Sequence, residues 1–209
     1  MAQGFLEALA TAGVRAARAA NGVGGLWEAI DVDLPADRFS RREADFIAER
    51  DSFYLATVSQ TGWPYIQHRG GPPGFLRMLD ERTLGFADFR GNRQYLTLGN
   101  LADEDRVALF LMDYPRRRRL KILARMAPHD LTAEPDLAAR LATPGYRAAT
   151  ERGFVLRLHA FDWNCSQHIT PRFTGLEVAA ATAPLLARLE DLQAENARLR
   201  GALGDHADE

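Results

Sequence analysis

Three consecutive hairpin-like segments constrain the fold of this chain more than any other feature of its sequence. Short runs with many alternating apolar residues cover residues 52–59 and 63–69, and a Gln-Thr-Gly turn separates them. Residues 74–89 and 106–131 have the same two-run pattern, and a further run covers residues 153–163. Such runs, rich in β-branched and aromatic residues and bounded by turn residues, are typical of antiparallel strands. We therefore expect an antiparallel barrel, because a sheet built from hairpins can protect its edges by closing.

Helices are expected around this sheet. Ser40 and Glu43 form a capping box, in which each side chain accepts a hydrogen bond from a backbone N–H group of the first helical turn. Phe46 and Ile47 follow and supply the apolar face of a short helix. Residues 134–149 are also helix-like, with five alanines and few β-branched residues. The body of the protein is therefore predicted to be mainly β with helical decorations.

The chain divides into three regions. Residues 1–39 form an alanine-rich helical extension that ends in a glycine-rich and proline-containing stretch. Residues 40–173 contain the predicted barrel, and residues 174–209 form a helix with an acidic tail. A length of 209 residues suits one domain with such appendages.

The C-terminal helix has the apolar spacing of a coiled coil. Its seam residues follow one another at intervals of 4, 3, 4, 3 and 4, and they are Leu185, Leu189, Leu192, Asn196, Leu199 and Leu203. A single asparagine in such a seam favours a parallel, in-register pair, because the two amides can hydrogen-bond to each other. The alternative is an amphipathic helix that packs on its own domain. We expect dimerisation, since the seam is narrow and charged residues flank it.

Bulk composition excludes several classes of protein. A net charge of −2 gives no overall attraction to nucleic acid or to an anionic membrane. Cys165 is the only cysteine, so an intrachain disulfide is impossible, and with His168 it is too small a set for a metal site. No apolar run approaches the roughly 18 residues of a membrane helix. The alanine-rich N-terminus is interrupted by charges and does not resemble a signal peptide. We expect a cytoplasmic protein with no metal, nucleic-acid or membrane partner.

The loop Arg90-Gly91-Asn92-Arg93 lies between an expected strand and an expected helix. It is either a solvated turn or an anion site, because guanidinium groups and the N–H groups that begin a helix both suit a phosphate. Further polar residues stand near the ends of other strands, namely Gln67, His68, Arg69, Asp88, Gln94, Asn164, Gln167, His168 and Arg172. Taken together, these residues predict a phosphate site and a polar ring around a planar heterocycle.

Four segments of the body resemble the pyridoxamine 5'-phosphate oxidase-like family, the FMN-binding split barrels. They are FIAERDSFYLATVSQTGWPYIQHRG, FADFRGNRQYLTLGNLADEDRVALFL, RRLKILARM and WNCSQHITPRF. The resemblance covers residues 40–173, and the order and spacing of the first two segments carry most of it. It implies a six-stranded antiparallel split β-barrel that forms a homodimer, with two FMN sites in the interface.

The same resemblance implies the residues of the cofactor site. The loop after the strand Phe86–Phe89 would hold the phosphate, and the segment Gln67–Gly70 would line the flavin together with Arg119. Gln167 and His168 would come from the partner chain. The predicted FMN-binding residues are Gln67, His68, Arg69, Gly70, Asp88, Arg90, Asn92, Arg93, Gln94, Arg119, Gln167 and His168.

The function implied is that of an FMN-dependent oxidoreductase acting on a small molecule, with NADH or NADPH as a possible electron donor. The family's oxidases carry a Ser-Arg-Lys loop and a Trp- and Arg-rich C-terminal segment, and neither is present here. These departures argue against pyridoxamine phosphate as the substrate. The alternatives are a non-catalytic flavin- or haem-binding protein, with His68 or His168 as an axial haem ligand, and a deazaflavin-dependent reductase.

Overall fold

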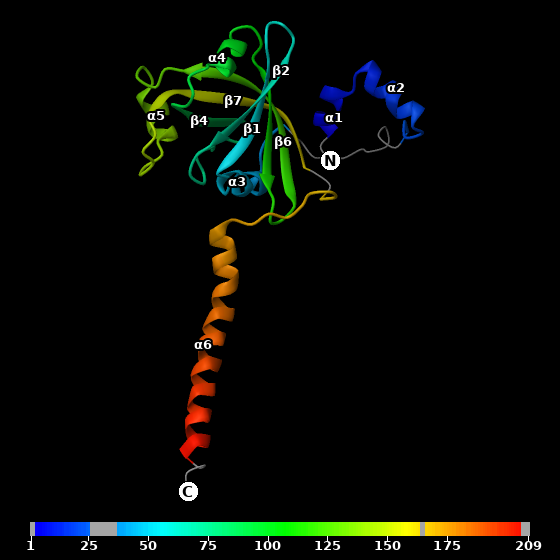
Figure 1. Ribbon diagram of the computed structural model, residues 1–209. Helices are drawn as coiled ribbons and strands as arrows, with labels where there is room; N and C mark the ends of the chain where they lie inside the picture. The colour runs from blue at the N-terminus through cyan, green and yellow to red at the C-terminus, as the bar shows by residue number, and fades with distance from the viewer. Residues whose placement is uncertain (1–2, 26–36, 164–165, 206–209) are drawn as a thin grey trace. The chain divides into compact units, whose positions relative to one another are not determined.

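A computed structural model of the chain describes residues 3–25, 37–163 and 166–205. Within these residues seven strands form one antiparallel sheet in the order β2-β1-β5-β6-β7-β4-β3 (Figure 1). The strands are β1 (Ser52–Val58), β2 (Pro64–Gly70), β3 (Arg77–Asp80), β4 (Thr83–Phe89), β5 (Arg106–Asp113), β6 (Arg118–His129) and β7 (Thr150–Trp163). The expected fold, mainly β with three successive hairpins, is confirmed.

The six strands that the family resemblance implies are one too few, whereas the three two-stranded hairpins and the run at residues 153–163 correspond to the seven strands that are present. The shortest strand is β3, the first strand of the hairpin expected over residues 74–89; it is four residues long and pairs only with β4, at one edge of the sheet. Its register shifts between Met78 and Asp80.

Six helices accompany the sheet within the described residues. They are α1 (Gln3–Leu9), α2 (Ala12–Ala20), α3 (Arg41–Ala48), α4 (Leu96–Leu101), α5 (Pro135–Leu141) and α6 (Gly175–Asp205). Figure 1 shows α3 and α4 at opposite ends of the barrel. The helix expected over residues 134–149 is shorter than predicted, because Pro144 and the left-handed Gly145 (φ 80°) follow its end closely.

The predicted capping box at the start of α3 is present. The Ser40 backbone N–H donates to Glu43 Oε2 at 3.0 Å, while the Ser40 hydroxyl accepts from the first turn of the helix. Trp163, at the end of β7, donates from Nε1 to Glu43 Oε1 at 2.7 Å. Phe46 and Ile47 are buried, as their spacing predicts. The box therefore fixes α3 to the last strand as well as beginning the helix.

The barrel interior is filled largely by phenylalanine and leucine. Phe53 packs edge-on against Phe86 with ring centroids 5.3 Å apart, and Phe86 lies 5.3 Å from Phe154. Each of the three side chains is at most 1% exposed. They come from β1, β4 and β7, so the core joins strands from both halves of the sheet.

The two sides of the split in the barrel approach each other through side chains. In the strand order β2 and β4 lie on opposite sides, and no strand pairing joins them among the described residues. Arg69 of β2 nevertheless donates from Nη1 to Asp88 Oδ1 of β4 at 2.6 Å. An ion pair therefore spans the split of the barrel where backbone hydrogen bonds are missing.

Residues 170–209 form a separate compact unit. Its helix α6 has 31 residues and contains Pro184. The side chains of residues 202–205, including the predicted seam residue Leu203, lie outside the described part of the structure. None of the helices within the described residues has the length and apolar character needed to cross a membrane.

Candidate functional site

A pocket opens in the split between β2 and β4. Its walls come from β2, β4, the loop after β4, the start of α4 and the start of β7. Four phenylalanines form its apolar part, namely Phe75, Phe86, Phe89 and Phe154. The polar residues that line it include Gln67, Arg69, Asp88, Asn92, Arg93, Gln94, Thr97 and Glu151. An apolar floor with a polar rim on one side suits a planar ligand that carries a charged group.

Asp88 is the centre of a buried ion triad at one side of this pocket. Its Oδ1 accepts from Arg69 at 2.6 Å, and its Oδ2 lies 3.3 Å from Arg152 Nε. Arg69 also lies over the rings of Phe86 and Phe154, at 5.9 and 5.8 Å from their centroids. Arg152 is the direct cross-strand neighbour of Asp88, which places the two on adjacent strands.

Glu151, one position earlier on β7, holds the loop that follows β4. Its Oε1 accepts from Arg90 Nε at 3.1 Å and from the Tyr95 hydroxyl at 3.2 Å. Its Oε2 accepts from Arg152 at 3.1 Å. The Arg90 backbone N–H adds a hydrogen bond to Ala149 O at 2.8 Å. Both ends of the loop are therefore fixed to β7.

The two carboxylates differ in their response to this environment. Burial raises the pKa of Asp88 above its usual value of 3.8, and the charges of Arg69 and Arg152 only partly oppose this effect. Burial also acts to raise the pKa of Glu151, but hydrogen bonds from Arg90 and Tyr95 outweigh it and place the pKa below its usual value of 4.5. Glu151 therefore remains ionised near neutral pH and forms an ion pair with Arg90.

Arg93 lies at the rim of the pocket. Its side chain is exposed, and its Nε donates only a long hydrogen bond, of 3.4 Å, to the Tyr95 hydroxyl. Among the described residues no carboxylate lies within ion-pair distance of its guanidinium group. Arg93 and Tyr95 both adopt left-handed backbone conformations, with φ of 60° and 54°. Such conformations are costly for residues other than glycine and are found most often at functional sites.

Asn92 and Gly91 shape the rest of the loop. The Asn92 side chain accepts from the Gln94 backbone N–H at 3.1 Å and donates to the Gln94 side chain at 3.3 Å. Gly91 lines the pocket, and a Cβ atom built on it would meet no other atom within 4 Å. Its lack of a side chain therefore leaves open space on the pocket wall.

Most of the twelve predicted cofactor residues come together in this pocket. Eight of them line it, namely Gln67, His68, Arg69, Gly70, Asp88, Asn92, Arg93 and Gln94. Arg90 is adjacent but does not line it, because its guanidinium group turns to Glu151. The His68 ring packs edge-on against Tyr54, with centroids 5.7 Å apart.

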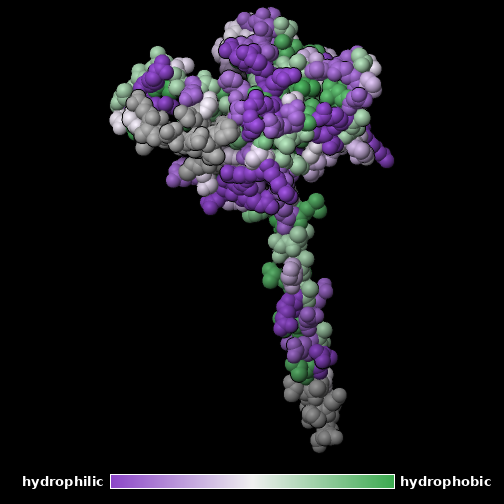
Figure 2. All heavy atoms as spheres, turned by 180° about the vertical axis from the view of Figure 1, so that it is seen from behind, coloured by the Kyte–Doolittle hydropathy of each residue, from purple (hydrophilic) through white to green (hydrophobic). Residues whose placement is uncertain are grey.

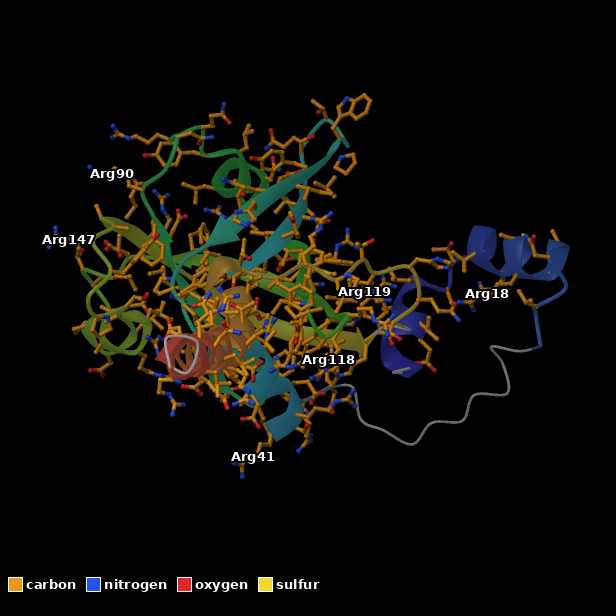
Figure 3. The ribbon with its side chains drawn as sticks, turned by 60° about the horizontal axis from the view of Figure 1, so that its bottom comes forward. Arg18, Arg41, Arg90, Arg118, Arg119 and Arg147 are labelled. Carbon is orange, nitrogen blue, oxygen red and sulfur yellow. The ribbon has the colours of Figure 1, made fainter. Side chains whose placement is uncertain are left out.

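Three predicted residues lie outside the pocket of this chain. Arg119 is on β6 with its guanidinium group 5.5 Å from the centre of the Phe110 ring, and Figure 3 shows it well apart from Arg90. Gln167 and His168 are exposed in the segment after β7, and His168 has a left-handed φ of 62°. The neighbouring Asn164 of the same predicted set lies outside the described residues.

Sequence reasoning missed Glu151 and Arg152. Both are charged residues at the start of a strand, a position with no distinctive local signal. They reach the site because β7 pairs with β4, more than 60 residues earlier in the chain. Tyr95 stands two residues after the predicted loop and was not predicted as part of the site; its hydrogen bond to Glu151 identifies its role.

The helix after the loop contributes less than the sequence indicates. The helix α4 has six residues and starts at Leu96, after the left-handed Tyr95, which caps it without a side-chain hydrogen bond. A helix this short has only a weak dipole, so the anion-binding capacity of the loop depends on its side chains and irregular backbone. Within the described residues no group of three His, Cys, Asp or Glu side chains is placed to hold a metal ion.

Comparison with known proteins identifies the family. Residues 39–159, more than half of the chain, match the model of the pyridoxamine 5'-phosphate oxidase family. The chain belongs to this family. No curated protein matches it.

Several solved structures resemble the barrel. An FMN-binding protein of Syntrophomonas wolfei is 14% identical, with a TM-score of 0.45, over 70% of this chain and 97% of that one. A Clostridium acetobutylicum protein related to general stress protein 26 is 11% identical, with a TM-score of 0.46, over 62% and 89%. An F420 reductase is 21% identical, with a TM-score of 0.38, over 56% and 93%. At these values the family assignment depends on the family model alone.

Proposed function

We propose that the protein is an FMN-dependent oxidoreductase whose cofactor phosphate binds at Arg93. The observation that carries the proposal is the charge balance of the pocket. Two arginines and two carboxylates line it, namely Arg69, Arg93, Asp88 and Glu151, and two further arginines, Arg90 and Arg152, lie next to it as ion-pair partners of these carboxylates. Four positive and two negative charges leave an excess of two positive charges, which suits a phosphate group carrying a charge of about −1.5 to −2.

The position of that excess supports a phosphate rather than another anion elsewhere in the pocket. The two carboxylates pair with Arg69, Arg90 and Arg152. Within the described part of the chain, no carboxylate lies within ion-pair distance of Arg93, whose Nε donates only to the Tyr95 hydroxyl. Its guanidinium group can therefore donate to phosphate oxygens, and it lies beside the amide of Asn92. The excess charge and the available donors coincide at the loop after β4.

Two further features of the pocket fit the flavin. Arg69 Nε is buried and has no hydrogen-bond partner among the described residues. Because buried donors are normally hydrogen-bonded, a ligand atom beside the phenylalanines of the pocket could serve as its acceptor. Gly91 leaves space for a ligand to approach the backbone of the loop. Arg69 would face the heterocycle, with Gln67 and Thr97, already hydrogen-bonded at 3.1 Å, forming part of its polar surround.

The residues of this chain would bind and orient the cofactor. Bound flavin supplies hydride or electron transfer, and the protein sets the polarity around the ring. Asp88 would hold the Arg69 guanidinium beside the ring, where that positively charged group favours electron density on the reduced cofactor. The substrate is then a small molecule, and NADH or NADPH would supply the electrons.

A homodimer belongs to the same proposal. The outer face of β1 and β2 exposes Tyr54, Val58 and Ile66, with side chains 40%, 42% and 66% exposed. Adjacent exposed apolar residues on one sheet face are typical of protein interfaces. A second copy of the chain would cover this face. It could also bring Gln167 and His168, which lie outside the pocket of their own chain, to the pocket of the other.

The deciding experiment compares FMN with riboflavin, which lacks the phosphate. Arg93→Ala should weaken FMN binding about 10- to 100-fold and leave riboflavin binding unchanged, because a charge-assisted hydrogen bond is worth about 1.5–3 kcal/mol. Arg41→Ala is the matched control: it also removes an exposed arginine, and Figure 3 shows Arg41 far from Arg90. Both affinities of the control should equal those of the unaltered protein.

Two results would contradict the proposal. One is equal affinity of the unaltered protein for FMN and riboflavin. The other is an Arg93→Ala variant that is folded by circular dichroism and binds FMN unchanged. The absorbance spectrum of the purified protein separates the alternatives, since flavin, deazaflavin and haem have different bands. Catalysis requires in addition that NADH or NADPH bleaches the flavin bands of the FMN-loaded protein.

A further inference from the structure

The helix α6 has an apolar stripe that its own unit leaves exposed. Leu185, Leu189, Leu192 and Leu199 are 71%, 51%, 45% and 58% exposed. Figure 2 shows apolar residues at intervals along α6, between hydrophilic ones. Helices in proteins gain most of their stability by packing an apolar face against another part of the structure. A long helix whose leucines are exposed therefore requires a partner.

The spacing assigns these leucines to the seam of a coiled coil. Steps of three residues lead from position a to position d of a heptad, and steps of four lead from d to the next a. Leu185, Leu192 and Leu199 therefore occupy d positions, and Leu189, Asn196 and Leu203 occupy a positions. The seam starts directly after Pro184, where the helix lacks one backbone hydrogen bond.

We propose that α6 pairs with α6 of a second copy of this chain as a parallel, in-register coiled coil. Asn196 argues for this arrangement. In a parallel pair each a position faces the a position of the partner, so the two Asn196 amides can hydrogen-bond to each other. In an antiparallel pair a faces d, and Asn196 would lie against a leucine with its polar group unsatisfied.

Charge complementarity supports the same partner and orientation. Glu195 lies at a g position, and Arg200 lies at the e position of the following heptad. In a parallel pair these positions of opposite helices face each other, which gives two attractive Glu195–Arg200 contacts related by the two-fold axis. Within one helix the two residues are five positions apart and do not face each other. The complementarity is therefore useful only between two copies.

This pairing would be an interface in addition to the sheet face of the barrel. The seam covers about three heptads, which is short for an independent coiled coil. Two linked weak interfaces strengthen each other, because formation of one raises the effective concentration for the other. Pairing of α6 would thus keep two barrels together at low protein concentration.

Disulfide cross-linking of the full-length protein tests the proposal. In a Cys165→Ser background, Leu199→Cys should form a disulfide-linked dimer on mild oxidation, because facing d positions can reach the Cα separation of about 4.4–6.8 Å that a disulfide requires. Arg198→Cys is the matched control, one residue away but outside the seam. The Leu199→Cys protein should cross-link at least about tenfold faster than the control.

A charge reversal then tests the orientation. Adding Glu195→Arg to the Leu199→Cys protein should lower the cross-linked fraction about three- to tenfold, and adding Arg200→Glu as well should restore it. Similar rates for Leu199→Cys and Arg198→Cys would overturn the proposal, as would failure of the second reversal to restore cross-linking. Light scattering of the same proteins shows separately whether the barrel interface persists, so the two interfaces can fail independently.

Discussion

Removing the Arg69–Asp88 pair tests whether side chains close the split of the barrel. The two residues come from strands that share no backbone pairing, and their side chains are 15% and 10% exposed. Each also has a second partner: Asp88 has Arg152 at 3.3 Å, and Arg69 lies over two phenylalanine rings. The perturbation is a double-mutant cycle with Arg69→Met, Asp88→Asn and the combined variant.

The structure sets the expected size of the effect. Removing one partner of an isolated buried pair costs about 3–5 kcal/mol. Here the remaining partner keeps another contact, so we expect about 1.5–3 kcal/mol for each single variant, the value of one hydrogen bond to a charged group. Burial raises the pKa of Asp88 despite two nearby arginines, which shows that desolvation outweighs their attraction. The double variant should therefore cost about 1–2 kcal/mol less than the sum of the single ones.

Urea unfolding at pH 7, followed by circular dichroism, measures all four proteins. A parallel cycle on Arg125 and Asp105 is the control, because this ion pair is 62% and 46% exposed and should show no resolvable coupling. Single variants at Arg69 and Asp88 that leave stability unchanged, or costs that simply add, would show that the split is closed by other contacts. The reasoning from the ion pair would then be wrong.

Two further predictions concern buried hydrogen bonds. Burial acts to raise the pKa of Glu43, but hydrogen bonds from Ser40 and Trp163 outweigh it and lower this pKa below its usual value of 4.5. The ionised carboxylate therefore stabilises the fold at pH values above 4.5, and this stabilisation is lost as the pH falls through the lowered pKa. Glu43→Gln should be less stable by about 1.5–3 kcal/mol at pH 7, and the deficit should shrink in acid; a deficit independent of pH in urea unfolding would contradict this. Thr57→Val should lower the free energy of unfolding by about 1–3 kcal/mol in the same assay, because Asn100 Nδ2 donates to Thr57 Oγ1 at 2.8 Å and would lose this acceptor. An unchanged unfolding midpoint would contradict this prediction.

The hairpins could be predicted from the sequence because their determinants are local. Alternation along each strand and the turn residues between strands identify pairs that are adjacent in the chain. The capping box at Ser40 is equally local, and it too is present in the structure. The hairpin expected over residues 74–89 is likewise present, as β3 and β4. Local patterns thus predict elements but not which distant strands meet.

The candidate site depends on contacts between distant parts of the chain, which limited its prediction. The loop after β4 could be identified from its arginines, but nothing in their local sequence distinguishes the roles of Arg90 and Arg93. The structure separates them, since Arg90 pairs with Glu151, 61 positions away, while Arg93 faces the pocket rim. The pairing of β4 with β7 brings Glu151 and Arg152 to the site. No spacing rule in a single sequence anticipates that pairing.

The position of the pocket follows from the way in which the barrel fails to close. A split sheet leaves a gap between strands that no backbone hydrogen bonds bridge, and here side chains of β2 and β4 face each other across it. Arg69 and Asp88 bridge one part of this split, and the pocket occupies the part beside them. A ligand bound there contacts strands on both sides of the split at once, so its binding free energy adds to the stability of the closed barrel. Cofactor binding and barrel closure are therefore expected to be thermodynamically coupled through Arg69, the residue that both require.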